Sequence, residues 1–188
     1  MLVTYEDIRN DESIKCYITE ADRALSALGY TEHSFPHVVK AATMAEMILL
    51  TLNYPKRTAE LAKIAGYMHD IGNIVNRIDH AQSGAVMAFR LLDRMGMDPV
   101  EIAMVISNHD ESTAAAVNPI AAALILADKT DVRRSRVRNH DFASFDIHDR
   151  VNYAVEDSKI YFNEDHSAII LDLKIDTSIS AVMDSKSF

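Results

Sequence analysis

Apolar positions recur with helical spacing along most of this chain. The clearest case lies between about residues 35 and 53, where apolar side chains return every three or four positions and polar ones fall between them. Ser34 precedes this segment as a candidate N-cap, and Pro36 falls in the first turn, where proline is tolerated. Further helices with this pattern are predicted over residues 13–28, 57–75, 81–95, 98–108 and 119–134.

The pattern changes after residue 155. Residues 159–162 and 168–173 are β-rich runs, and the five residues between them have the composition of a turn. We expect a small antiparallel hairpin there, followed by a short helix near 177–184. Because an isolated hairpin is only marginally stable, it should pack on the helical body or on a partner chain. The sequence thus predicts an all-α domain over 1–155 with a β-hairpin appendage over 156–188.

Composition and charge restrict the classes of function. The 188 residues, 48% of them hydrophobic and 25% charged, suffice for one globular core, and only five Gly and four Pro favour helices. A net charge of −9 disfavours binding of nucleic acid through its phosphates, although it permits a small phosphorylated substrate held by metal ions. The single cysteine, Cys16, the lack of an apolar leader and the short apolar stretches lead us to expect a cytoplasmic protein without a membrane partner. The apolar hairpin could also pack against a second copy of the chain, so a homodimer is a further expectation.

Two adjacent ionisable residues, His69 and Asp70, lie in an apolar helical run that begins at Ile64. Burying an imidazole and a carboxylate side by side is costly unless something pairs with them, and a divalent metal ion would do so. A lone histidine near a helix start is often a capping or surface residue, and a lone aspartate can pair with an arginine. Several residues together are harder to explain in this way, and they predict a metal-dependent hydrolase. The further candidate ligands are His37, His80, His109 and Asp128.

These residues, in this order, resemble the HD-domain superfamily of metal-dependent phosphohydrolases. The likeness covers roughly residues 30–135 and includes the flanks of two motifs, His69-Asp-Ile-Gly72 and Leu126-Ala-Asp-Lys-Thr-Asp131. It implies the all-α HD-domain helical bundle, in agreement with the periodicity. Carried over to this chain, the minimal set that binds one metal ion is His37, His69, Asp70 and Asp128.

The resemblance also implies a second ion. In members with two metals, additional histidines stand where His80 and His109 stand here, and the Asp70 carboxylate would bridge the two ions. His33, four residues before His37, resembles a further ligand of some two-metal members. We therefore expect two divalent ions. His and Asp ligands suit iron or manganese, which we favour, and also zinc, cobalt and, less well, magnesium.

The chain departs from the cyclic-dinucleotide branch of this superfamily. Asn73 replaces a frequent lysine, Asn108-His109 replaces a pair of histidines, and the Gly-Tyr-Pro motif is missing. The chain is therefore more similar to a small stand-alone HD hydrolase. The expected reaction is hydrolysis of a nucleotide or related phosphomonoester or diester by a metal-bound hydroxide that attacks phosphorus in line.

Cationic side chains are candidates for binding the phosphate. Lys40 lies one helical turn after His37 and is the first candidate beside Asp70 for a catalytic role, although a solvated lysine is the alternative. Lys129 and Arg133 are weaker candidates. The four arginines up to Arg138 either form a phosphate-binding rim or a solvated helix end paired with acidic residues further along the chain.

Two other functions are compatible with this ligand set. Some relatives use two irons for oxygen-dependent oxidation, so a di-iron oxygenase is one alternative. The other is a non-catalytic metal- or nucleotide-binding module. The ligand set looks complete, which argues against a degenerate site.

Overall fold

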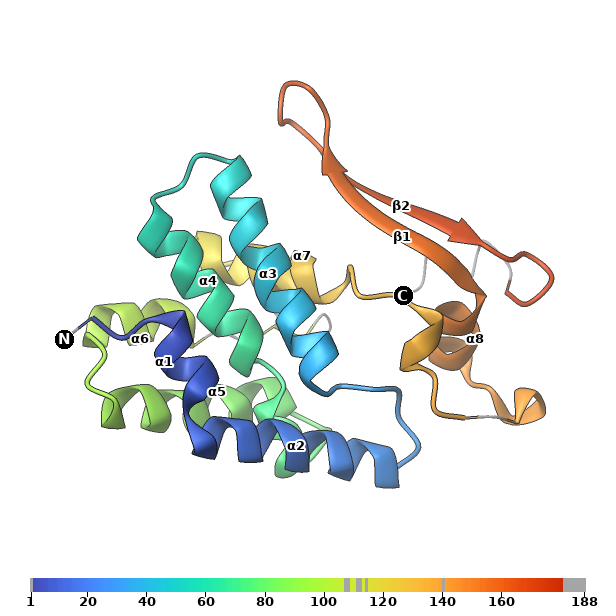
Figure 1. The fold of residues 1–188 in the computed structure, drawn as a ribbon, viewed down its shortest axis with the longest axis horizontal. Coiled ribbons are helices and arrows are strands. Elements are labelled where there is room, and N and C mark those ends of the chain that lie inside the picture. The colour runs from blue at the N-terminus through green and yellow to red at the C-terminus, as the bar shows by residue number, and fades with distance from the viewer. Residues whose placement is uncertain (1, 107–108, 111–112, 114, 140, 181–188) are drawn as a thin grey trace. The chain divides into compact units, whose positions relative to one another are not determined.

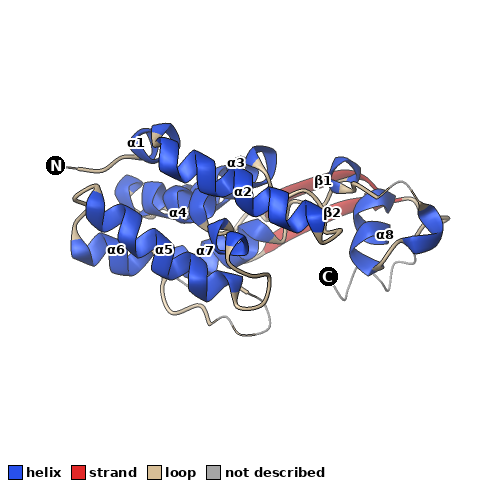
Figure 2. Cartoon of the chain, turned by 90° about the horizontal axis from the view of Figure 1, so that it is seen from below, coloured by secondary structure: helices blue, strands red, loops and turns tan. Residues whose placement is uncertain are grey.

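The computed structural model describes the chain except for residues 1, 107–108, 111–112, 114, 140 and 181–188. Its described part contains eight α-helices and one two-stranded antiparallel sheet (Figures 1 and 2). This confirms the predicted all-α class with a C-terminal hairpin. None of the described helices is both long and apolar enough to cross a lipid bilayer.

The chain divides into two compact units. Unit 1 comprises Met1–Ala24 and His33–Asp128, and unit 2 comprises Leu25–Glu32 and Lys129–Phe188. The division predicted at residue 155 falls within unit 2 and stays a prediction.

Unit 1 is built around three mutually packed helices. In it, α3 packs against both α4 and α7, and α4 also contacts α7 (Figure 1 shows α3 and α4 side by side). Gly66 of α4 makes the close approach to α3 possible, since a Cβ at this position would lie 2.7 Å from the Cα of Ala42. The helices of unit 1, which include most of α2, are α1 (Tyr5–Asn10), α2 (Glu12–Ala27), α3 (Phe35–Thr51), α4 (Lys56–Met68), α5 (His80–Arg94), α6 (Pro99–Val105) and α7 (Pro119–Asp128).

Side-chain caps set several helix starts. Thr4 and Asp7 form a capping box at α1, a short helix that the periodicity did not predict. The Asp98 carboxylate accepts a hydrogen bond from the Val100 amide at the start of α6. Ser34 occupies the N-cap position of α3 as predicted, but its side chain makes no capping hydrogen bond, and proline lies in the first turn.

Two predicted helices are shorter than expected. The helix predicted over 57–75 ends at Met68 and is followed by a short 3₁₀ helix, Ile71–Ile74, because Gly72 packs so closely on α5 that a Cβ would overlap the His80 carbonyl oxygen. The helix predicted over 119–134 ends at Asp128, where unit 2 begins. Apolar spacing continues past both ends, so periodicity alone did not locate them.

Unit 2 contains α8 (Ile147–Ala154) and the hairpin of β1 (Val155–Phe162) and β2 (Ile169–Ile175). The strands pair from Val155 with Ile175 to Phe162 with Ile169, which confirms the predicted hairpin. The sequence did not predict α8. Of the helix predicted near 177–184, residues 177–180 form a turn and the remainder lies outside the described residues. The core of this unit consists of Val132, Val151 and Val155, with Ile147, Leu173 and Ile175 packed against them.

Candidate metal centre

Four predicted ligands meet where α3, α4 and α7 pack together. The Nε2 atom of His37 lies 3.3 Å from Oδ2 of Asp70 and 3.3 Å from Oδ1 of Asp128. The Nε2 atom of His69 lies 3.2 Å and 3.5 Å from the same two oxygens. Ligands about 2.1 Å from a tetrahedrally coordinated ion lie about 3.4 Å apart, so this spacing fits one cation. These residues, His37, His69, Asp70 and Asp128, are called the first cluster below.

A second group of ligands shares Asp70. The Nε2 atoms of His80 and His109 lie 3.2 Å apart, at 3.6 Å and 4.0 Å from Oδ1 of Asp70. In the group Asp70, His80 and His109, one ligand atom of each residue lies within 4.8 Å of those of the other two. The same holds for the group His37, His69 and Asp70. The residues Asp70, His80 and His109 are called the second cluster. The two oxygens of Asp70 thus face different clusters, as a carboxylate that bridges two ions would.

One buried oxygen, Oδ2 of Asp70, lies against the Nε2 atoms of His37 and His69. Among the described residues, Oδ2 of Asp70 is a buried side-chain oxygen without a hydrogen bond. Such an atom is costly to bury, and a cation would satisfy it. The donor set and this orphaned oxygen together show that the residues fit a divalent ion.

Backbone carbonyls fix the orientation of two imidazoles. Nδ1 of His69 lies 2.8 Å from the Gly66 carbonyl oxygen, and Nδ1 of His80 lies 3.0 Å from that of Arg77. Because a carbonyl can only accept, each Nδ1 carries the proton and donates it. When each imidazole is neutral, the lone pair of its Nε2 therefore points into the clusters, as metal ligation requires.

Burial and charge set the protonation of the site. Burial opposes ionisation of Asp70 and Asp128, but the neighbouring histidines hold the pKa of both carboxyl groups well below the usual range. Burial lowers the pKa of His69, yet the two carboxylates outweigh it and raise that pKa well above its ordinary value. For His80 burial lowers the pKa, and for His109 it lowers the pKa to about 3. The second-cluster imidazoles are thus neutral and ready to bind a cation at neutral pH.

The clusters open onto a polar cavity of about 60 Å³. The cavity gives the metal centre space for a small ligand. Three of its lining residues, Arg77, Asp110 and His33, belong to neither cluster. Its described lining residues are His33, Asp70, Arg77, His80, His109, Asp110 and Asp128.

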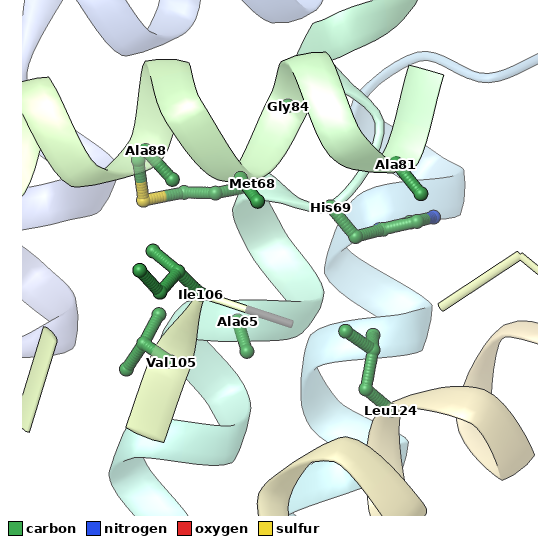
Figure 3. Close-up of a pocket in the computed structure, with 10 residues that line it drawn as sticks. Ala65, Met68, His69, Ala81, Gly84, Ala88, Val105, Ile106 and Leu124 are labelled. Carbon is green, nitrogen blue, oxygen red and sulfur yellow. The ribbon is translucent and has the colours of Figure 1, made fainter. Parts of the chain in front are cut away.

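A separate apolar cavity of about 20 Å³ adjoins His69 (Figure 3). It is lined by residues such as Met68, Ile106 and Leu124, and the labelled imidazole points away from these side chains. Apart from His69, its described lining consists of apolar residues and Gly84. The candidate metal centre thus adjoins an apolar region at His69, and a surrounding of low polarity strengthens electrostatic interactions.

Two predicted site residues lie outside both clusters. The ring of His33 packs at 5.3 Å, centre to centre, on that of His37, and His33 lines the polar cavity. Lys40 is half-buried on α3 and is not among the described residues that line that cavity. Ligation by His33 and a catalytic role for Lys40 stay predictions.

The arginine-rich segment of unit 2 is involved in internal pairing. Arg133 contacts Asp131 and Glu32, at 2.9 Å and 2.6 Å. Arg136 is buried and donates to the backbone carbonyl oxygens of Glu32 and Asp131. Arg134 lies over the ring of Tyr153. Of the two interpretations offered, salt-bridged pairing fits better, although these partners lie outside the acidic stretch that was expected to supply them.

The sequence reasoning did not identify three polar residues of the site. Nδ2 of Asn73 donates to Oδ1 of Asp70 at 2.9 Å, whereas the sequence marked Asn73 only as a departure from a family pattern. Arg77 and Asp110 line the cavity from loops, where no periodicity signals a role. In the sequence, the one indication of their role was that Arg77 lies three residues before His80 and Asp110 directly follows His109.

Comparisons with known proteins identify one family. The family model described as HD domain matches residues 34–133, more than half of the chain. The match includes every residue of both clusters. No curated protein and no solved structure matches the chain.

Proposed function

The chain belongs to the HD domain family, and we propose that it is a metal-dependent phosphohydrolase that acts on a small phosphate ester. The observation that carries this proposal is the Asp70 carboxylate, whose oxygens face two clusters of histidines. Such an arrangement would hold two cations close together, as in many sites that hydrolyse phosphate esters. The predicted nucleotide or related ester remains our proposed class of substrate.

The residues of the two clusters have distinct tasks in this proposal. The first cluster would hold one ion and the second cluster the other, with Asp70 as the shared ligand. Divalent ions bound there would lower the pKa of a water molecule and neutralise charge on the phosphate. Iron or manganese is our proposal for the ions, given the His and Asp ligands.

The surrounding residues keep the ligands in place. Asn73 donates to Asp70, and the Gly66 and Arg77 carbonyl oxygens accept from His69 and His80. Each contact fixes a ligand that would otherwise rotate. The polar cavity beside the clusters would admit the phosphate group of the substrate.

The proposal is tested by metal analysis combined with a substrate panel. The purified protein, loaded with manganese or iron, should bind about two ions per chain and hydrolyse a phosphomonoester or diester. Asp70→Asn should lose both ions and the activity, while His109→Ala should lose about one ion. His148→Ala, which removes an exposed histidine of unit 2, is the control and should change neither measurement.

Two results would contradict the proposal. One is a metal-loaded protein that hydrolyses no ester of the panel. The other is an Asp70→Asn variant whose metal content and turnover equal those of the unaltered protein. One ion per chain in both the unaltered protein and His109→Ala would reduce the site to one ion.

A further inference from the structure

Arg77 is the described residue that brings a permanent positive charge to the polar cavity. It lies in the loop between the 3₁₀ helix Ile71–Ile74 and α5. The other described lining residues carry carboxylates or imidazoles. No other guanidinium, and no ammonium group, is found among them, so any direct cationic contact from the described lining comes from Arg77.

The side chain of Arg77 is held beside the second cluster. Its Nη1 lies 3.3 Å from Oδ1 of Asn73 and 3.4 Å from Nε2 of His80. The same Asn73 donates through Nδ2 to Oδ1 of Asp70, at 2.9 Å. Asn73 thus connects the guanidinium to the shared carboxylate and fixes the position of one relative to the other.

A guanidinium cannot itself be a metal ligand. It has no available lone pair and stays protonated at every accessible pH. Its planar donors match two oxygens of a phosphate. The guanidinium therefore gives the polar cavity a group suited to binding an oxyanion beside the second cluster.

We propose that Arg77 binds a non-bridging oxygen of the substrate phosphate and that the site selects phosphomonoesters over diesters. This inference rests on the proposed function. Ions held by the two clusters would neutralise charge on the phosphate, and the guanidinium would add a contact to a further non-bridging oxygen. A phosphomonoester has three such oxygens, whereas a diester has two, so only the monoester uses every contact.

The first experiment measures the binding of inorganic phosphate by calorimetry. The manganese-loaded protein is compared with Arg77→Gln and with Arg77→Lys, which keeps the charge but loses the planar fork. Arg77→Gln should weaken phosphate binding about 10- to 100-fold, with Arg77→Lys in between. The matched control is Arg90→Gln, which removes the same charge from an arginine of α5 whose side chain is 80% exposed. The control should bind phosphate as the unaltered protein does.

The metal content of the variant shows whether Arg77 binds phosphate or instead occupies the position of a metal ion. Arg77→Gln should bind as many manganese ions as the unaltered protein, because Arg77 is not a ligand. A higher metal content in this variant would mean that the guanidinium occupies the position of an ion, and would overturn the proposal. Unchanged phosphate affinity in Arg77→Gln, or an equal loss in Arg90→Gln, would also overturn it.

Turnover tests the preference for monoesters. With p-nitrophenyl phosphate, Arg77→Gln should lose about tenfold or more in kcat/KM, mainly through a higher KM. With bis(p-nitrophenyl) phosphate the loss should be smaller, and equal losses would overturn the preference. If the unaltered protein cleaves neither compound nor any other ester of the panel, the proposed function fails, and the phosphate titration still decides whether Arg77 binds phosphate.

Discussion

At the level of single residues, the protons on the histidines should affect how the proposed cation binds. Burial lowers the pKa of His69, but the charges of Asp70 and Asp128 raise it well above its ordinary value. Burial lowers the pKa of both His80 and His109. Near neutral pH the metal-free protein should therefore hold a proton on His69 and none on the other two imidazoles.

This difference predicts proton release when the first cluster binds its ion. The ion must displace the proton of His69, so metal affinity should increase with pH up to the raised pKa, by about tenfold per pH unit for one proton. Calorimetric titrations with manganese in buffers of different ionisation enthalpy should show release of at least the His69 proton. His109→Ala should release the same number. Binding without proton release would mean that His69 is neutral before the ion arrives.

At the level of elements, the close contact between α3 and α4 positions His37 against His69. A Cβ on Gly66 would lie 2.7 Å from the Ala42 Cα, an atom of the backbone that cannot rotate away. Alanine is the better helix former by about 1 kcal/mol, but forcing the helices apart should cost more. Gly66→Ala should thus lower the free energy of unfolding by about 1–3 kcal/mol, measured with urea on the metal-free protein, and weaken metal binding.

Gly84→Ala provides a matched comparison, because it makes the same change within a helix. There the new Cβ would lie 3.1 Å from the His69 carbonyl oxygen, a tight contact that a small shift relieves. The loss of stability should therefore be smaller than for Gly66→Ala. Equal losses, or a more stable Gly66→Ala protein, would mean that the α3–α4 contact is not the limiting one.

The sequence predicted the long elements better than the short ones. A helix such as α3 repeats its apolar pattern over several turns, and the hairpin strands are marked by β-branched residues on both sides of a turn. The α1 and α8 helices are too short for periodicity, although Thr4 and Asp146 cap them and could have indicated their starts. The end of α4 depends on Gly72 packing against α5, a contact between segments that no local pattern contains.

At the scale of the whole molecule, the metal centre combines residues that are distant in the sequence. Its first-cluster residues were predicted from residue chemistry and a family resemblance, and all four converge. The contacts around them were not predictable in this way. Arg77 and Asn73 act through side-chain directions that only the folded loop determines. Lys40 was predicted from its place one helical turn after His37, but it is not among the described residues that line the cavity.

The division into two units predicts where a bound ion stabilises the chain. Every residue of both clusters lies in unit 1, while unit 2 has its own core around Val132 and Val151. An ion at 100 times its dissociation constant adds about 2.7 kcal/mol to the stability of the state that binds it.

Amides of α3 and α4 that exchange only when unit 1 unfolds should therefore exchange about 100-fold more slowly with manganese than with chelator. Amides of β1 and β2 should keep their rates, and Asp70→Asn should show no slowing anywhere. Hydrogen exchange followed by mass spectrometry measures both sets at once, and equal slowing of the hairpin amides would show that the two units unfold together.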